Sequence, residues 1–135
     1  MDWKIEMVPV PVADVDRAKD FYANKLGFPV DVDHAVGDTF RIVQVTPPGS
    51  GCSIAFGIGV CDMKPGDLAG VQFVVDDIEQ AHARLVANGV APSNIFHFAD
   101  GGQVDGKGDD DWNSFVTFSD PDGNRWTVQE RPRPA

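Results

Sequence analysis

The sequence has few cysteines, histidines and glutamates, three residue types that commonly bind metal ions or take part in catalysis. Its 135 residues include 2 cysteines, 3 histidines and only 3 glutamates. Cys52 and Cys61 are nine residues apart, and the strand expected between them holds them too far apart for an easy disulfide. We therefore expect two reduced thiols, as in a cytoplasmic protein, whose buried side chains only fill space in the core.

Basic residues and long apolar runs are also scarce. The sequence has 11 lysines and arginines and 21 aspartates and glutamates, which gives a formal net charge of −10. This negative field repels phosphate backbones and anionic lipids, so neither nucleic acid nor a membrane is expected as a partner. No apolar run approaches the ~20 residues that span a bilayer, and residues 1–4 do not resemble a signal peptide. The expected location is cytoplasmic, with a neutral or cationic small molecule as the partner.

Two segments of the chain repeat each other. Residues 10–18 correspond to residues 73–81 after a shift of 63, and each segment is a short apolar run, an acidic residue and a helical pattern. Asp14 and Asp77 stand where helix N-caps belong, and Gly27 and Gly89 stand where helices end. Each copy is therefore predicted to begin with a strand and a helix.

The second part of each copy repeats with a shift of 74. The Pro/Gly turn at 46–50 corresponds to the turn at 120–124, with strand-like runs on both sides of each turn. The shift grows because the second copy carries an insertion, mostly Ala99–Asn113, which is expected to form an irregular loop. Phe40–Val45 and Cys52–Gly57 are the strands expected around the first turn, and Ser114–Phe118 and Trp126–Glu130 those around the second.

The pattern predicts an α+β fold of two tandem βαβββ units. Their mixed sheets are expected to form a concave half-barrel with the helices on the outside, and such a surface suits a small molecule. All of 1–135 forms one domain, with unit 1 at about 4–57, a linker at about 58–69 and unit 2 at about 70–131.

This duplicated unit resembles the vicinal-oxygen-chelate superfamily of glyoxalase I, the bleomycin-resistance proteins and extradiol dioxygenases. Residues 12–22, Leu26-Gly27-Phe28 and Asp120-Pro121-Asp122-Gly123-Asn124 carry the resemblance. It implies a concave binding face and a homodimer. In its enzymes, it also implies a divalent metal held by His, Glu or Gln on the first and last strands of each unit.

The resemblance places the four metal-ligand positions on Met7, Ser53, Gly70 and Thr127. None of these four residues is a suitable ligand for zinc, iron, nickel or manganese, because such sites require imidazole, carboxylate or thiolate groups. We therefore expect no metal and no other cofactor.

Alternation along the strands then predicts which residues line the concave face. They form a mainly apolar, uncharged surface with a few amide and hydroxyl groups, to which Trp112 adds an aromatic ring at the end of the inserted loop. The expected ligand-binding residues are Met7, Pro9, Ser53, Ala55, Gln72, Trp112, Thr127 and Gln129.

The leading hypothesis is a metal-free binding protein that resembles the bleomycin-resistance branch and sequesters or carries an organic ligand such as an antibiotic. The alternative is a metal-dependent lyase or dioxygenase of the same superfamily, which would need other ligands, such as His34, His97 and Glu130. A third possibility is a protein-interaction module whose concave face is filled by side chains. Catalytic residues are not identifiable from the sequence.

Overall fold

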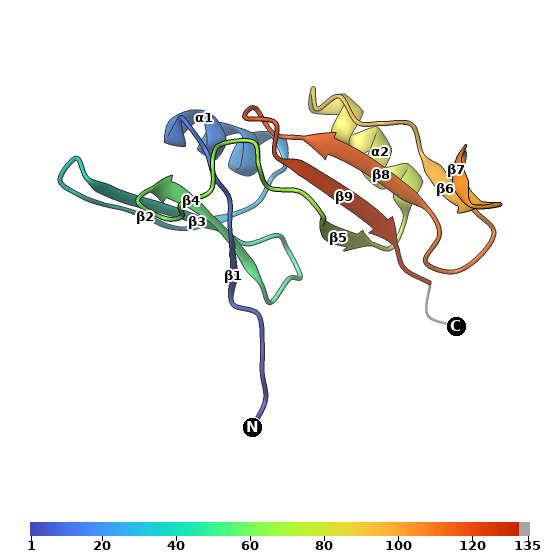
Figure 1. Cartoon of the computed structure of the whole chain (residues 1–135), viewed down its shortest axis with the longest axis horizontal. Helices are drawn as coiled ribbons and strands as arrows, with labels where there is room; N and C mark the ends of the chain where they lie inside the picture. Colours follow the sequence, from blue (N-terminus) through green and yellow to red (C-terminus); the bar gives the residue numbers. More distant parts are fainter. Residues whose placement is uncertain (133–135) are drawn as a thin grey trace. The chain divides into compact units, whose positions relative to one another are not determined.

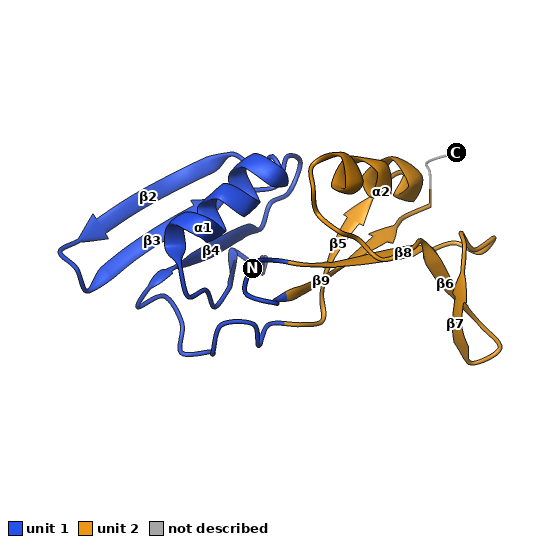
Figure 2. Cartoon of the chain, turned by 90° about the horizontal axis from the view of Figure 1, so that it is seen from above, with its two compact units in different colours: residues 1–68, 120–124 blue, residues 69–119, 125–135 orange. Residues whose placement is uncertain are grey.

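The computed structural model describes residues 1–132, which fall into two compact units (Figure 2). Unit 1 comprises Met1–Leu68 together with Asp120–Asn124. Unit 2 comprises Ala69–Ser119 and the described residues from Arg125 onward. The five-residue turn of the second repeat therefore groups with unit 1.

Unit 1 contains a four-stranded mixed sheet with one helical segment (Figure 1). The strands lie in the order β1-β4-β3-β2, with β1 parallel to β4 and the other neighbours antiparallel. The elements are β1 (Met7–Pro9), α1 (Val15–Lys19), η1 (Asp20–Lys25), β2 (Val30–Val36), β3 (Phe40–Val45) and β4 (Ser53–Ile58).

Unit 2 repeats this plan with one additional strand. Its five strands lie in the order β5-β9-β8-β6-β7, and β5 pairs with β9 in parallel, as β1 does with β4. The elements are β5 (Val71–Val75), α2 (Ile78–Ala87), β6 (Phe96–Ala99), β7 (Gly102–Asp105), β8 (Phe115–Ser119) and β9 (Arg125–Glu130). The predicted α+β class with two tandem, mixed-sheet units is confirmed.

Both helices begin at the predicted aspartates. The Asp14 side chain accepts a hydrogen bond from the backbone N–H of Arg17, and the Asp77 side chain accepts one from that of Gln80. Each bond satisfies one of the amide groups that a first helical turn leaves unpaired. Gly27 and Gly89 follow the helix ends with φ of +76° and +78°, the left-handed conformation that ends many helices.

The first helix changes its winding after Lys19. Residues 20–25 form a π-helical segment, in which the amide of Leu26 donates to the carbonyl of Phe21 at 2.9 Å. Two successive aromatic residues of this segment, Phe21 and Tyr22, are both buried. A regular 3.6-residue period does not predict the π-helical winding.

The prediction of an irregular loop over Ala99–Asn113 is wrong for its first part. The chain forms a hairpin there, with β6 and β7 paired from Phe96–Asp105 to Ala99–Gly102. Asp100 and Gly101 occupy the turn with φ of +52° and +77°. A two-residue Asp-Gly turn of this type matches the twist of antiparallel strands, so these residues favour a hairpin over a loop.

Candidate functional site

One face of the unit 1 sheet packs against its helical segment. The ring of Phe56 in β4 lies 5.4 Å from that of Tyr22, between ring centroids. Because side chains alternate along a strand, Ser53 and Ala55 point away from the helix. Met7 and Pro9 of β1 lie beside them in register, so these four predicted site residues share the helix-free face.

Unit 2 presents the corresponding face. The Glu130 carboxylate accepts a 2.9 Å hydrogen bond from the backbone N–H of Ile78, which places Glu130 on the α2 side of β9. Thr127 and Gln129 therefore point to the opposite, helix-free face. Thr127 lies beside Gln72 in the register of the β5–β9 pair, so three more predicted site residues share one surface.

A chain of hydroxyl groups leads from the unit 1 face to an acidic side chain. The oxygens of Ser53 and Thr46 lie 2.7 Å apart, and the Thr46 hydroxyl donates to the carboxylate of Asp31. Ser53 is only 7% exposed, whereas Thr46 is half-buried. Sequence analysis identified Ser53 but missed Thr46 and Asp31, because the Asp31 side chain reaches Thr46 at an irregularity in the β2–β3 register.

Gln44 is a second polar residue that sequence analysis missed. It lies opposite Ala55 in the register of β3 and β4, and it is therefore on the helix-free face. Its side chain is half-buried, and its amide makes no hydrogen bond within residues 1–132. The strand prediction for Phe40–Val45 contained enough information to place it, since Gln44 is the one amide in an otherwise apolar and basic strand.

Trp112 and Gln129 are brought together in unit 2. The side-chain amide of Gln129 donates a 2.9 Å hydrogen bond to the backbone carbonyl of Trp112. Trp112 has φ of +62°, and its side chain remains 51% exposed. The structure thus connects two predicted site residues 17 positions apart, and it leaves the indole free to contact a ligand.

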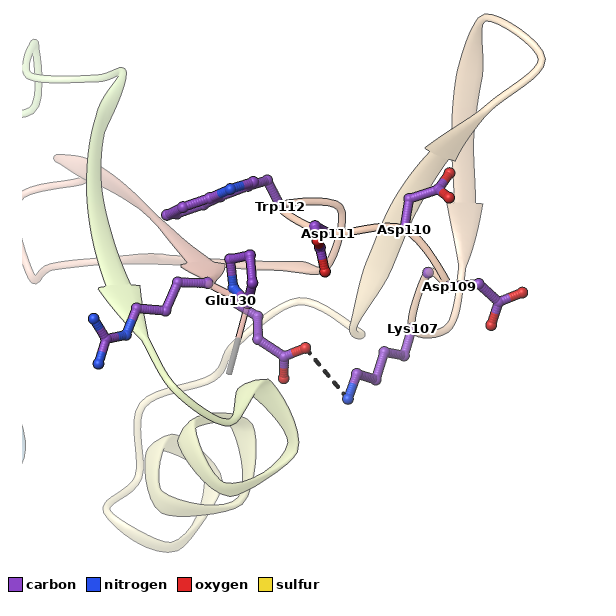
Figure 3. A pocket seen from close by; sticks show the side chains of 9 residues that line it. Lys107, Asp109, Asp110, Asp111, Trp112 and Glu130 are labelled. Atoms are coloured by element: carbon purple, nitrogen blue, oxygen red, sulfur yellow. Dashed lines mark ion pairs between the residues drawn. The ribbon is translucent and has the colours of Figure 1, made fainter. Parts of the chain in front are cut away.

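A pocket of about 380 Å³ in unit 2 contains Trp112 (Figure 3). Lys107 and Glu130 form a 3.3 Å ion pair across it, as the dashed line in Figure 3 shows. The lining is largely polar and open, and it is formed by Lys107, Gly108, Asp109, Asp110, Asp111, Trp112, Glu130, Arg131 and Pro132. Of the predicted ligand-binding residues, only Trp112 is among them.

Three of the four positions that correspond to metal ligands, Met7, Ser53 and Thr127, carry side chains unsuited to a metal ion. Met7 and Ser53 lie side by side but offer a thioether and a hydrogen-bonded hydroxyl. Gly70 precedes β5, and the register places Gln72 rather than Gly70 beside Thr127, at the fourth position. Gln72 is of a ligand type, but it is one side chain where a catalytic metal site needs about three protein ligands. The connection from Met7 to the helix cap is two residues longer than that from Gln72, which explains the difference from the sequence correspondence.

The residues of the alternative ligand set, His34, His97 and Glu130, are divided between the two units. His34 is exposed in β2 of unit 1, and both oxygens of Glu130 have partners in unit 2. His97 lies in β6, where one ring nitrogen is 2.7 Å from the carbonyl oxygen of Gly106. Within residues 1–132, no group of three or more His, Cys, Asp or Glu side chains is placed to hold a metal ion.

The strongest electrostatic network lies on the helix side of unit 1, away from these residues. Arg41 and Lys19 both reach the carboxylate of Asp33, at 3.0 Å and 2.8 Å. The hydrogen bond from Arg41, followed by that from Lys19, holds the pKa of Asp33 well below its usual range. Asp33 in turn raises the pKa of the Arg41 guanidinium, with Asp16 adding to the effect. This network stabilises the fold and is not part of the candidate site.

The fold defines a class of proteins built from two tandem βαβββ-type units with mixed sheets. The model of the Glyoxalase/Bleomycin resistance protein/Dioxygenase superfamily matches residues 4–128, and the chain belongs to that superfamily. Among curated proteins, it is 29% identical over 132 residues to the uncharacterized protein YetH of Bacillus subtilis (strain 168), covering 94% of this chain and 98% of YetH.

Several solved structures share this fold. TnmS3, an antibiotic binding protein from Streptomyces sp. CB03234, is 32% identical, with a TM-score of 0.77 over 97% of this chain and 98% of its own. A glyoxalase/bleomycin resistance protein from the same organism is 33% identical, with a TM-score of 0.73, over 93% and 99% of the two chains. A superfamily member from Sphaerobacter thermophilus DSM 20745 is 29% identical, with a TM-score of 0.75, over 96% and 98%.

No helix among the described residues has the length and apolar character that crossing a membrane requires.

Proposed function

We propose that this protein binds a small organic molecule, without a metal ion, on the helix-free faces of its sheets, and so sequesters or carries it. The observation that carries the proposal is the chemistry of those faces. Met7, Pro9, Ser53 and Ala55 in unit 1 are all uncharged, as are Gln72, Thr127 and Gln129 in unit 2. An apolar surface with a few amide and hydroxyl groups suits an organic ligand held by burial and a few hydrogen bonds.

An antibiotic is the first ligand class to examine. The support comes from TnmS3, an antibiotic binding protein that shares nearly the whole length of this chain at 32% identity. The exposed ring of Trp112 adds an aromatic surface on which a flat or cationic group stacks favourably.

Calorimetric titration against a panel of antibiotics tests the proposal. We expect at least one compound to bind with a stoichiometry of about one per chain. Trp112→Ala should weaken that binding about 5-fold, because a buried stacking contact contributes on the order of 1 kcal/mol. Trp3→Ala is the matched control, since Trp3 is 88% exposed and lies outside the predicted site. Absence of binding across the panel would contradict the proposal.

Metal analysis of the purified protein separates this function from a metal-dependent lyase or dioxygenase. We expect no stoichiometric transition metal, because only one of the positions that hold the ion in the enzymes, Gln72, carries a ligand-type side chain. About one tightly bound zinc, iron, nickel or manganese ion per chain would favour the enzyme instead.

The protein also forms a homodimer in this proposal. All seven residues of β2 are exposed, including Val32 and Val36, and unit 2 exposes Val74 and Phe98. Apolar side chains on sheet surfaces and edges are commonly covered by a partner. Sedimentation equilibrium should give twice the mass of the 14.6 kDa chain, and a monomer at micromolar concentration would contradict this part.

The free thiols of Cys52 and Cys61 support a cytoplasmic location.

A further inference from the structure

The hydrogen bonds of Thr46 fix the direction in which Ser53 donates its proton. A threonine hydroxyl has one proton and two lone pairs, whereas an ionised carboxylate can only accept. The Thr46 hydroxyl is bonded to both the Asp31 carboxylate and the Ser53 hydroxyl. Because its only proton goes to Asp31, Thr46 must accept the proton of Ser53 in the 2.7 Å bond.

Ser53 is consequently left with lone pairs and no free proton. Its backbone groups are bonded separately, since its amide donates to the carbonyl of Glu6 at 2.9 Å and its carbonyl accepts from the Cys52 thiol. Within residues 1–132, no other donor reaches the Ser53 hydroxyl oxygen. A buried oxygen with unused lone pairs gains most from a ligand that supplies a donor, because water competes little there.

We propose that Ser53 is a dedicated hydrogen-bond acceptor in the binding site, and that the ligand therefore presents an N–H or O–H donor to β4. This inference rests on the proposed function and adds the polarity of the ligand group. Half-buried Pro9 supplies apolar surface on the same face, whereas Ala55 beside it is fully buried. The unbonded amide of Gln44, opposite Ala55, provides a second polar contact of either sense.

Asp31 fixes the acceptor role of Ser53 indirectly, through the Thr46 hydroxyl. If Thr46 did not have the carboxylate to donate to, its hydroxyl and that of Ser53 could rotate, and Ser53 could serve as donor or acceptor. The hydrogen bonds from Ser53 to Thr46 and from Thr46 to Asp31 prevent Ser53 from acting as a donor to the ligand. Thr46 and Asp31 are thus positioning residues, whereas Ser53 touches the ligand.

Three small aromatic probes test the polarity directly. Indole carries one N–H donor, 1-methylindole has a methyl group in its place, and quinoline offers only an acceptor nitrogen. Each is titrated into ¹⁵N-labelled protein at millimolar concentration, and the amide shifts of Ser53, Ile54 and Ala55 are followed by NMR. We expect indole to bind about 3- to 10-fold more tightly than 1-methylindole at this position, as one hydrogen bond contributes.

Two variants and one control locate the effect. Ser53→Ala should make the Kd values of indole and 1-methylindole equal. Thr46→Val releases the Ser53 proton and should tighten quinoline binding at least 3-fold. Thr39→Ala, an exposed residue of the β2–β3 turn, should change none of the three Kd values. The amide spectrum of each variant confirms that it is folded.

Three results would overturn the inference: equal Kd values for the two indoles in the unaltered protein, an indole preference that survives Ser53→Ala, or no binding at 53–55. The antibiotic titration separates these failures from a failure of the proposed function. Antibiotic binding without a donor preference at Ser53 would leave the proposed function intact and refute the acceptor role. Absence of both kinds of binding would refute both.

Discussion

The hydroxyl of Tyr22 donates a 2.7 Å hydrogen bond to the buried carboxylate of Asp120, which lies 98 residues later in the chain. Asp120 also accepts from the backbone amides of Asp122 and Asn124 and from the Asn124 side chain. The Asn124 side chain further donates to the carbonyl of Pro11 at 2.8 Å. The turn of the second repeat is therefore built into unit 1 by a network in which the Asp120 carboxylate has four donors.

Removal of the Tyr22 hydroxyl should destabilise the protein measurably. Tyr22→Phe keeps the ring contacts with Phe21 and Phe56 but deprives the buried carboxylate of one donor. We expect a loss of about 1–2 kcal/mol in the free energy of unfolding, as is usual for a buried bond to a charged acceptor. Urea denaturation measures this loss, and an unchanged midpoint would show that the bond contributes nothing.

Low pH should reduce the free energy of unfolding, partly through Asp33, whose side chain is 27% exposed. The pKa of this carboxyl is lower in the folded than in the unfolded chain, so the stability it contributes is complete above its unfolded value of 3.8 and is lost as the pH falls further. Asp33→Asn should cost about 1 kcal/mol near neutral pH and flatten the pH dependence below about pH 4. Denaturant unfolding from pH 7 to pH 2 measures both.

Asp38→Asn provides the control for this experiment, because Asp38 is exposed in the turn after β2 and makes no ion pair with the described residues. It should leave both the stability and its pH dependence unchanged. Equal behaviour of the two variants would mean that Arg41 and Lys19 do not stabilise the Asp33 carboxylate.

Gly108 should tolerate no side chain, although its neighbour in the same inserted segment, Gly102, should accept one. A Cβ at Gly108 would lie 2.3 Å from the carbonyl oxygen of Asn113 and 3.0 Å from the Cβ of His97, whereas one at Gly102 would meet nothing within 4 Å. Gly108→Ala should displace the segment that carries Trp112 and shift the tryptophan emission spectrum. Gly102→Ala should leave the spectrum as it is, and identical spectra would contradict this description of the loop.

Chelation should leave the thermal stability unchanged. Since only Gln72 among the metal-ligand positions of the superfamily's enzymes is of a ligand type here, we expect no ion to contribute to folding. Differential scanning calorimetry with EDTA, and separately with added zinc or nickel, should give the same Tm within about 1 °C. A rise with one metal that EDTA reverses would show an ion bound to the folded state, since such binding stabilises by mass action.

Local rules predicted much of the fold from particular residues. Asp14 and Asp77 cap their helices because a short acceptor next to unpaired amides is favourable in any context. The β6–β7 hairpin was predictable as well from Asp100-Gly101, although the glycine-rich composition around that dipeptide suggested a loop. The π-helical winding of η1 was not predictable, because the spacing of its apolar residues fits an ordinary α-helix as well.

The candidate site also has features that the sequence predicts and features that it does not. Strand alternation correctly grouped Ser53 with Ala55 and Thr127 with Gln129 on faces opposite the helices. The hydrogen bond between Gln129 and Trp112 could not be predicted, because it depends on how the inserted segment returns to the sheet. The polarity of Ser53 was hidden for a related reason, since it is set by Asp31 across an irregular strand pair.

The sequence by itself determined the duplicated α+β plan and the starts of both helices, because these depend on residue type and short-range spacing. Only the tertiary structure decided which side chains meet, from Tyr22 and Asp120 to the proton chain that ends at Ser53. Hydrogen bonds between distant strands depend on register and twist, and those are fixed only when the whole sheet packs.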